Sequence, residues 1–332
     1  MQAVDQAVLT RVRDTLAAGK PCWLATIVAT YGSSPRPVGS LLCVDRKGEI
    51  VGSLSGGCVE DDLIEKLVAG ELVNDRPRLL KYGLAPEDTE KLGLPCGGHL
   101  HVVVEPLAAR HADTFAHIVR RLDARRCVSR RVQLASGTMT ASDCDDFAEL
   151  ELHEPPHGPV ILEHTYGPRR QLFLIGAGMV SRYLAEMAQA LDYEVTVCDP
   201  REHMLEQWAV PGVKTVCAMP DDGVLAHADD PRSAIIALTH DPRIDDMGLM
   251  AALESQAWYV GAMGSERTSA KRRERLAQLD LTREQIERLH APVGLSIGSK
   301  TPPEIAIAIL AELTALSKAL PARADARSRA TA

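Results

Sequence analysis

A hydrophobic run turns into a glycine-rich loop at residues 172–181, Leu-Phe-Leu-Ile-Gly-Ala-Gly-Met-Val-Ser. The pattern is typical of the first strand, phosphate-binding turn and first helix of a Rossmann fold. Gly176 permits the tight turn, and Gly178 lets a pyrophosphate approach the N-terminus of the helix. Ser181 stands at the third position, where glycine or alanine is usual and a small residue is required. The stretch therefore predicts a Rossmann-like domain.

An acid ends the next expected strand, since Asp199 follows residues 194–198. An acid at this place can hold a ribose 2′-hydroxyl, so Asp199 leaves NAD binding open. Arg201, two residues later, can meet a phosphate instead. A Rossmann scaffold with a vestigial or reused nucleotide site explains the same residues, because fold does not fix function.

Strands and helices alternate from residue 171 onward, which predicts a parallel sheet. The expected strands are 171–175, 194–198, 213–217, 233–238 and 257–261. The expected helices are 179–191, 203–209, 245–254, 266–279, 282–289 and 302–319. We therefore expect a Rossmann-like domain over 171–320, followed by a disordered tail over 321–332.

Two loops of this domain follow strand ends, where ligands bind in such folds. In the first, His240 with Asp241 and Asp245 can bind a metal or move a proton. The structural alternative is a capped turn, with Asp245 as the N-cap of the next helix. The second loop, 261–268, places glycines, among them Gly264, and a basic group at the same edge.

The N-terminal part has a different pattern, which predicts an α+β domain over 1–153. Its expected helices are 4–18, the segment after Cys58, and 107–123, and its expected strands are 23–28, 40–44, 49–52, 78–82, 101–105 and short ones within 127–165. Prolines and glycine crowd residues 154–159. We therefore place a linker at 154–170.

Two loops of this domain combine glycine with cysteine. In the first, Ser55, Gly56 and Gly57 precede Cys58 at the mouth of an expected helix. The helix N-terminus offers unpaired N–H groups and a partial positive charge, which suit a phosphate, an oxyanion or a thiolate. The structural alternative is a glycine-rich turn with a small buried cysteine. The acids at 60–62 oppose thiolate formation and predict a weakly activated thiol.

The second loop, residues 94–99, carries Cys96, Gly97 and Gly98. It repeats the combination of a thiol with two glycines between two expected strands. The two loops together favour a functional role for these cysteines over a role as core filler.

Composition bounds the class of protein. A chain of 332 residues favours two domains, and a net charge of −8 argues against a nucleic-acid surface. The start lacks the pattern of a signal peptide, and no apolar run is long enough to span a bilayer. Eight cysteines without a C-x-x-C pair are untypical of a disulfide framework or a zinc site. We expect a reduced, cytoplasmic protein that binds no membrane.

Taken in order, the motifs resemble those of the xanthine dehydrogenase accessory protein family, XdhC/CoxI. The similarity covers about residues 10–318. The matching segments are 32–39, 52–60 and 95–98 in the first half, and 175–178, 197–201, 238–241, 261–265 and 292–298 in the second. Departures are small: Ser296 stands where an acid is frequent, and Pro200 precedes Arg201.

The resemblance implies an accessory protein more than an enzyme. Members bind the molybdenum cofactor, as molybdopterin or its cytosine dinucleotide form, protect it, assist its sulfuration and deliver it. The recipient is a molybdenum hydroxylase, of the xanthine dehydrogenase or aldehyde oxidoreductase type, in its apo form. A cysteine desulfurase is a further implied partner, and self-association as a homodimer is usual.

The resemblance also implies a set of cofactor-binding residues. An anionic cofactor calls for an arginine such as Arg36 together with backbone amides. The soft thiolate of Cys58 is suited to contact molybdenum or to carry sulfur. The full expected set is Arg36, Ser55, Gly56, Gly57, Cys58, Cys96, Gly97, Gly98, Gly176, Gly178, Asp199, His240 and Gly264.

Two other functions remain open from the residues alone. An NAD-dependent oxidoreductase would use Gly176, Gly178 and Asp199 for the cofactor and His240 as proton donor. A metal-dependent enzyme would rest on His240, Asp241 and Asp245. Tight NAD binding with turnover would favour the first, and a stoichiometric metal would favour the second.

Overall fold

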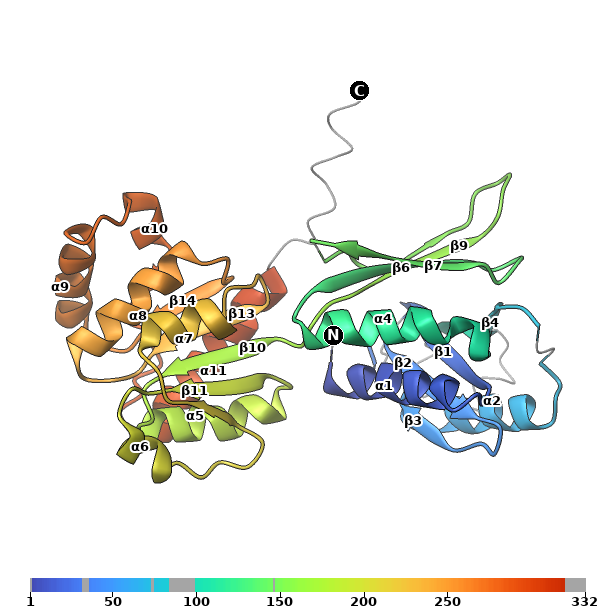
Figure 1. The fold of residues 1–332 in the computed structure, drawn as a ribbon, viewed down its shortest axis with the longest axis horizontal. Coiled ribbons are helices and arrows are strands. Elements are labelled where there is room, and N and C mark those ends of the chain that lie inside the picture. The colour runs from blue at the N-terminus through green and yellow to red at the C-terminus, as the bar shows by residue number, and fades with distance from the viewer. Residues whose placement is uncertain (1, 32–35, 73–74, 84–98, 146, 320–332) are drawn as a thin grey trace. The chain divides into compact units, whose positions relative to one another are not determined.

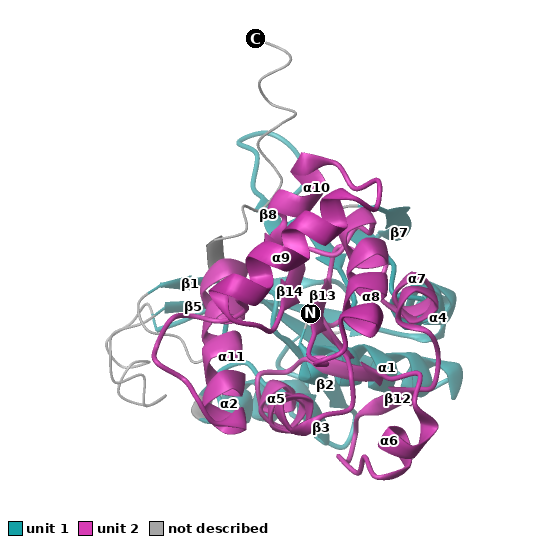
Figure 2. Cartoon of the chain, turned by 90° about the vertical axis from the view of Figure 1, so that its left-hand side faces the viewer, with its two compact units in different colours: residues 1–168, 322–332 teal, residues 169–321 magenta. Residues whose placement is uncertain are grey.

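The protein divides into two compact units, residues 1–168 and 169–321 (Figure 2). The computed structural model describes residues 2–31, 36–72, 75–83, 99–145 and 147–319. The tail expected to be disordered, 321–332, lies outside the described residues.

The second unit is built on a six-stranded parallel sheet in the order β12-β11-β10-β13-β14-β15, of which Figure 1 labels β10, β11, β13 and β14. This is the strand order of the Rossmann fold, with the direction of winding reversed between β10 and β13. Ligands of such sheets bind beyond the carboxyl ends of the strands at this reversal. The strands are β10 (Gln171–Ile175), β11 (Glu194–Cys198), β12 (Lys214–Val216), β13 (Ser233–Ala237), β14 (Tyr259–Ala262) and β15 (Leu289–His290).

Helices cover both faces of this sheet. Side chains of β10 alternate between them: Leu172 and Leu174 join the core with α5 and α11, while Phe173 and Ile175 join the core with α7, α8 and α9. The strand is therefore buried on both sides. The helices are α5 (Met179–Ala190), α6 (Glu202–Glu206), α7 (Pro220–His227), α8 (Pro242–Glu254), α9 (Glu266–Ala277), α10 (Arg283–Glu287) and α11 (Pro302–Ala319).

Two elements of this unit differ from the sequence expectation. Helix α7 is absent from the expected elements. Gly223 lets this helix pack closely on β11, because a Cβ there would lie 2.7 Å from Cys198 Sγ. The helix expected over 282–289 ends at Glu287, and Leu289–His290 instead form the edge strand β15. Helix α7 depends on its close packing against the sheet, and β15 depends on its pairing with the neighbouring strand β14.

The first unit contains two antiparallel sheets. The larger has the order β3-β2-β1-β5-β4 and the smaller β7-β6-β9-β8. The strands are β1 (Cys22–Tyr31), β2 (Leu41–Asp45), β3 (Ile50–Gly52), β4 (Arg78–Tyr82), β5 (His99–Leu107), β6 (Cys127–Gln133), β7 (Met139–Cys144), β8 (Glu151–His153) and β9 (Ile161–Tyr166).

Among the described residues, three α-helices cover the larger sheet (Figure 1): α1 (Ala3–Ala17), α2 (Cys58–Val68) and α4 (Ala112–Asp123). Leu63 and Leu67 of α2 pack on one face, against residues such as Val102. Helices α1 and α4 share the other face through residues that include Val12 and Phe115. A short 3-10 turn, η1 (Ala109–His111), precedes α4.

The expected linker at 154–170 is partly wrong. Its segment Ile161–Tyr166 forms β9, which pairs with both β6 and β8 inside the first unit. Leu162 and Tyr166 are fully buried there. The breakers at 154–159 belong to the connection between β8 and β9, so the composition that suggests a linker marks a turn within the unit.

A buried ion pair joins the two sheets of the first unit. Arg130 on β6 donates from Nη1 and Nη2 to the two carboxylate oxygens of Glu105 on β5, at 2.8 and 2.7 Å. Its side chain is 0% exposed and that of Glu105 1%. The guanidinium also lies over the rings of Phe115 and Tyr166, each 5.7 Å away. The Arg130 guanidinium therefore contacts residues from both sheets and from helix α4.

Replacing Glu105 by Gln leaves the Arg130 guanidinium buried without its counter-charge. We expect Glu105→Gln to lower the free energy of unfolding by about 3–5 kcal/mol. Urea unfolding followed by circular dichroism measures the loss. The control is Glu163→Gln, which breaks an exposed pair with Arg131 (Nε–Oε1 3.3 Å) and should cost less than about 1 kcal/mol. Equal losses of unfolding free energy in the two variants would show that the buried pair stabilises the unit no more than the exposed pair does.

The pH dependence of stability should carry a contribution from His164 on β9. Burial, followed by the charge of Arg130, lowers the pKa of His164 to about 3. In the unfolded chain His164 binds a proton near pH 6.5, whereas in the folded protein it does so only near pH 3. The stability that the neutral His164 contributes is therefore fully present above pH 6.5 and is lost as the pH falls toward 3. His164→Gln should remove a slope of up to about 1.4 kcal/mol per pH unit from this window.

Unfolding curves of wild type and variant at a series of pH values test this difference. An unchanged slope in His164→Gln would contradict the assignment.

Candidate functional site

A cleft of about 900 Å³ opens where the second sheet reverses its winding. Its lining comes from the turn after β10, from Arg201 and Met204 after β11, from residues 238–243 after β13, and from Met263 after β14. Gly176, Gly178 and His240, three of the residues expected from the sequence, are thus brought together. The position agrees with the general rule for ligand sites in parallel sheets.

Asp199 is held away from this cleft lining. Its carboxylate is fully buried and accepts hydrogen bonds from Ala177 N (2.9 Å) and from the backbone N, Nε and Nη2 of Arg201 (3.0, 2.9 and 2.8 Å). Burial alone raises its pKa, but these hydrogen bonds outweigh it and leave the pKa lowered. Asp199 therefore fixes the glycine turn, and its oxygens are engaged within the protein instead of being presented to a ribose.

The same tripeptide, Asp-Pro-Arg, recurs after β13. Asp241 accepts hydrogen bonds from Arg243 N (3.0 Å), Nε (3.0 Å) and Nη2 (2.8 Å), as Asp199 does from Arg201. Because β11 and β13 both neighbour β10, the two arginines flank the glycine turn. Each is neutralised by its own aspartate, so the cleft presents directional N–H donors without a large positive charge.

Asp245 is not the N-cap expected from the sequence. Helix α8 begins earlier, and Asp241 caps it by accepting from Arg243 N. Asp245 is buried and accepts from Thr239 N (3.2 Å), Thr239 Oγ1 (2.7 Å) and Arg272 Nη2 (2.8 Å). Burial outweighs these contacts and raises its pKa to about 6. Through its two hydrogen bonds with Thr239, Asp245 fixes the loop that follows β13.

These contacts bear on the metal hypothesis. His240 is exposed at the cleft, while Asp241 and Asp245 are held by arginines. Among the residues that the structure describes, no group of three His, Cys, Asp or Glu side chains is placed to hold a metal ion. The structure thus gives no support to a centre built on His240, Asp241 and Asp245.

Gly264 lies after β14 but outside the cleft lining. A Cβ at this position would meet the side chains of Thr268 and Ser269 at 3.4–3.5 Å. These are ordinary van der Waals distances, so packing alone does not require a glycine at this position.

In the first unit, the strand ends next to the sequence motifs lie at one end of the larger sheet. Tyr31, the last residue of β1, pairs with His99, the first of β5. Gly52, the last of β3, pairs with Leu42 near the start of β2. Cys96, Gly97 and Gly98 lie outside the described residues, as does the side chain of Cys58. The strand ends that flank the segments 32–39, 52–60 and 95–98 nevertheless lie at the same end of the sheet.

The amides of the Ser55-Gly56-Gly57 turn already have an anionic partner. Glu60 Oε1 accepts from the backbone N of Leu54, Ser55 and Gly56, each at 2.8 Å, and Oε2 accepts from Gly57 N at 3.1 Å. Burial raises the pKa of Glu60, but the donors from Ser55 and its neighbours outweigh it and lower the pKa to about 2. The donors expected to face a phosphate thus face a carboxylate of the same chain.

Arg36 also has a partner within the protein. Its Nη2 lies 3.3 Å from Asp5 Oδ1 on α1, and its side chain is 19% exposed. Asp5 accepts from Leu41 N as well, at 3.1 Å. Burial, the largest effect, raises the pKa of Asp5 despite these contacts. Arg36 is therefore held at the motif-bearing end of the sheet by α1.

Sequence reasoning missed an aromatic cluster at this end. The ring of Tyr31 lies 6.4 Å from that of His99 and 5.4 Å from that of His101, both edge-on. Tyr31 is 53% exposed. The alternation His-Leu-His over 99–101 at a strand start was the available signal, because it puts both imidazoles on one face of the sheet.

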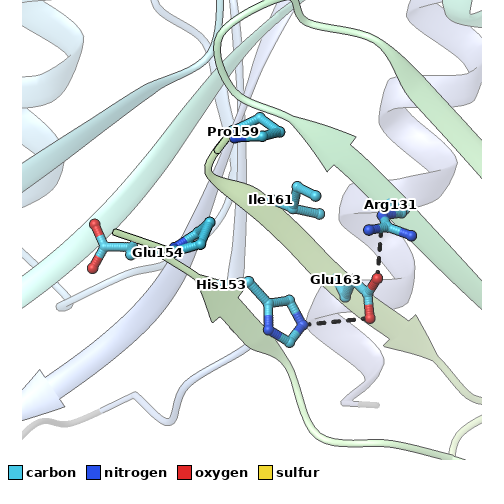
Figure 3. A pocket seen from close by; sticks show the side chains of 7 residues that line it. Arg131, His153, Glu154, Pro159, Ile161 and Glu163 are labelled. Carbon is cyan, nitrogen blue, oxygen red and sulfur yellow. Dashed lines mark ion pairs between the residues drawn. The ribbon is translucent and has the colours of Figure 1, made fainter. Parts of the chain in front are cut away.

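A second hollow, of about 540 Å³, lies on the smaller sheet of the first unit (Figure 3). Glu163 forms ion pairs there with Arg131 Nε (3.3 Å) and His153 Nε2 (3.5 Å). These side chains are solvent-exposed and belong to none of the motifs. We regard the hollow as a charged surface of the sheet.

Two family profiles match the chain in the order of its units. The profile described as the XdhC and CoxI family matches residues 15–83, and the one described as the XdhC Rossmann domain matches residues 172–313. The chain belongs to the XdhC and CoxI family. The expected family and the expected Rossmann-like second domain are thereby confirmed.

Curated relatives resemble the chain over nearly its whole length. The chain is 26% identical to the molybdenum cofactor insertion chaperone PaoD of Escherichia coli, over 94% of this chain and 88% of PaoD. It is also 26% identical to a protein of Bacillus subtilis described as a probable component of xanthine dehydrogenase, over 87% of this chain and 91% of that protein.

A solved structure is similar over most of the chain. The crystal structure described as a xanthine dehydrogenase from Bacillus halodurans matches with a TM-score of 0.72 and 28% identity, over 94% of this chain and 96% of that one. The similarity to each of these three proteins therefore spans residues of both units of this chain.

The two glycines of the cleft provide a matched pair of variants. Gly176 has φ +104°, and a Cβ there would lie 2.5 Å from Thr239 Cγ2, so Gly176→Ala should destabilise the second unit by more than about 1 kcal/mol. At Gly178 a Cβ meets nothing within 4 Å, so Gly178→Ala should change stability by less than about 0.5 kcal/mol. The added methyl group should nevertheless obstruct a diphosphate at the N-terminus of α5.

Thermal unfolding and calorimetric titration with NAD and with cytidine diphosphate measure the two effects. We expect Gly178→Ala to weaken the binding of whichever nucleotide the wild type binds. Undiminished binding by Gly178→Ala, or binding of neither nucleotide by the wild type, would exclude a diphosphate at this turn.

Proposed function

We propose that this protein is a molybdenum cofactor insertion chaperone for an enzyme of the xanthine dehydrogenase or aldehyde oxidoreductase type. The observation that carries the proposal is its membership of the XdhC and CoxI family over both units, with a relative named as such a chaperone across most of both chains. In this role it binds the cofactor, protects it, supports its sulfuration and delivers it to the apo-enzyme.

The geometry of the cleft supports binding over catalysis. Asp241 and Asp245, the acids nearest to His240 in sequence, are held by Arg243 and by Thr239 with Arg272. A positioned acid–base pair usually needs a third group that orients the imidazole. His240 is instead an exposed ring at the cleft, suited to contact a ligand that enters and leaves.

We assign parts of the cofactor to the two units separately. In the second unit, the turn at Gly176 and Gly178, together with Arg201, Arg243 and His240, fits the phosphate and nucleotide part. The open space beside Gly178 is the feature that such a ligand requires. When bound, the cofactor supplies the molybdenum and its sulfur and oxygen ligands.

In the first unit, Cys58 and Cys96 are the residues proposed for the sulfur and molybdenum side, because soft thiolates suit both. Ser55, Gly56, Gly57, Gly97 and Gly98 shape their loops. Asp199, Gly264 and Arg36 then act as supports of the binding loops. A cysteine desulfurase, the apo-hydroxylase and a second copy of the chain are the proposed partners, in the cytoplasm.

The membrane plays no part in this proposal. Over the described ranges, the structure contains no helix that is both long and apolar enough to cross a bilayer.

A comparison of two cysteine variants tests the role of Cys58. Protein purified from cells that make the cofactor should carry pterin and molybdenum, measured by pterin fluorescence and elemental analysis. Cys58→Ala should lower activation of the apo-hydroxylase by at least about tenfold, the size of effect seen when a metal site loses a supporting group. Cys217→Ala, at an exposed cysteine of the second unit, is the control and should behave as wild type.

Absence of pterin from the purified protein, with full hydroxylase activity in a strain that lacks the gene, would overturn the proposal. Stable incorporation of the protein into the mature hydroxylase on gel filtration would favour a structural component of the enzyme, in line with the description of the Bacillus subtilis relative. Hydride transfer from bound NAD would favour the oxidoreductase alternative instead.

A further inference from the structure

The turn that leads into Cys58 is wrapped around one carboxylate. Glu60 accepts six hydrogen bonds from residues 53–57. Four come from the backbone N–H groups of residues 54–57 and two from the hydroxyls of Ser53 and Ser55. Glu60 is only 5% exposed. The buried carboxylate of Asp199, by comparison, accepts four hydrogen bonds.

This arrangement has the form of an anion-binding nest. Consecutive amides converge on one point because Gly56 has φ +86°, which turns its N–H to the same side as those of its neighbours. In glycine-rich loops of this type the anion is usually a ligand's phosphate. Here the anion is the third residue of helix α2, which reaches back over its own N-terminus to Gly57 and beyond.

We propose that Glu60 is a positioning residue whose carboxylate acts as a built-in anion and fixes the backbone that presents Cys58. The thiol-bearing turn is then preformed before any cofactor binds. The phosphate of a cofactor is bound by other donors, since those of this turn are filled. The inference rests on the proposed function only in giving Cys58 a role in cofactor transfer.

The chemistry of the nest separates Glu60 from an ordinary capping residue. Its six donors require an acceptor, and buried donors without one are costly. Glu60→Ala removes the acceptor and leaves a space shaped for a carboxylate. A small carboxylate from solution, acetate or formate, fits that space and should restore the turn by binding the folded state. A residue with a general role in stability would show no such response.

Asp61 provides the matched control. It is the next residue of the same helical turn and is exposed, so Asp61→Ala removes one negative charge near Cys58 without touching the nest. A comparison of Glu60→Ala with Asp61→Ala therefore separates the effect of the nest from that of local charge.

The experiment uses the full chain and reads the turn directly. Hydrogen–deuterium exchange of the peptide that contains residues 54–57 should be at least about tenfold faster in Glu60→Ala than in wild type or Asp61→Ala. The rate of Cys58 alkylation by iodoacetamide, followed by peptide mass spectrometry, should change more in Glu60→Ala than in Asp61→Ala, which reports the effect of local charge alone. Acetate or formate should return both readouts toward wild type, and chloride at the same ionic strength should not.

Two results would overturn the proposal: exchange in Glu60→Ala equal to that in Asp61→Ala, or no recovery with acetate and formate. If Glu60→Ala does not fold, Glu60→Gln serves in its place. Its amide fills the space but offers one acceptor oxygen and places an NH₂ group against N–H donors, so faster exchange that acetate does not reverse is expected. Exchange equal to wild type in Glu60→Gln would overturn the need for an anion.

Activation of the apo-hydroxylase distinguishes this inference from the proposed function. Loss of activation in Cys58→Ala but not in Glu60→Ala would refute the positioning role and leave the chaperone function standing. Full activation by both variants, with the exchange and recovery results as expected, would refute the role of Cys58 and leave the nest standing.

Discussion

Buried carboxylates that accept hydrogen bonds from loop backbones hold the functional edges of both units. Glu60 collects the amides of residues 54–57, Asp199 takes Ala177 N, Asp245 takes Thr239 N, and Asp5 takes Leu41 N. A buried N–H group without an acceptor is costly, so a glycine-rich loop that folds back on itself needs a partner for its amides. In this protein the partner is repeatedly an acid from the same chain.

This constraint alters how the motifs act. The glycines and serines of the first unit, and the acid after β11, resemble ligand-binding groups in sequence, yet much of their hydrogen-bonding capacity is used internally. The groups that face the cleft of the second unit include the open side of Gly178, the exposed ring of His240 and two arginines that are already paired with aspartates. Such a cleft suits a ligand that is held by directional contacts and then released, which fits the proposed delivery role.

The predictable part of the structure is the part governed by local pattern. The strand and glycine turn at 171–178, the alternation that follows, and helices such as α5 and α11 follow from periodicity and from the steric needs of the turn. Helix α7 is hard to predict, because Asp221, Asp222 and Gly223 are poor helix formers and only the close packing on Cys198 explains the glycine. Strand β9 could not be separated from a linker, because its neighbours β6 and β8 are what make residues 161–166 a strand.

The sequence by itself determined the family, the Rossmann-like second domain and which loops carry glycine and cysteine. These follow from local spacing, which a single chain displays in full. The tertiary structure decided which of those groups face a ligand. It placed Gly176, Gly178 and His240 on one cleft, turned Asp199 and Asp245 inward, and gave the amides of the Cys58 loop to Glu60. The physical reason is that hydrogen-bond partners are chosen by burial and three-dimensional proximity, which residue spacing alone does not encode.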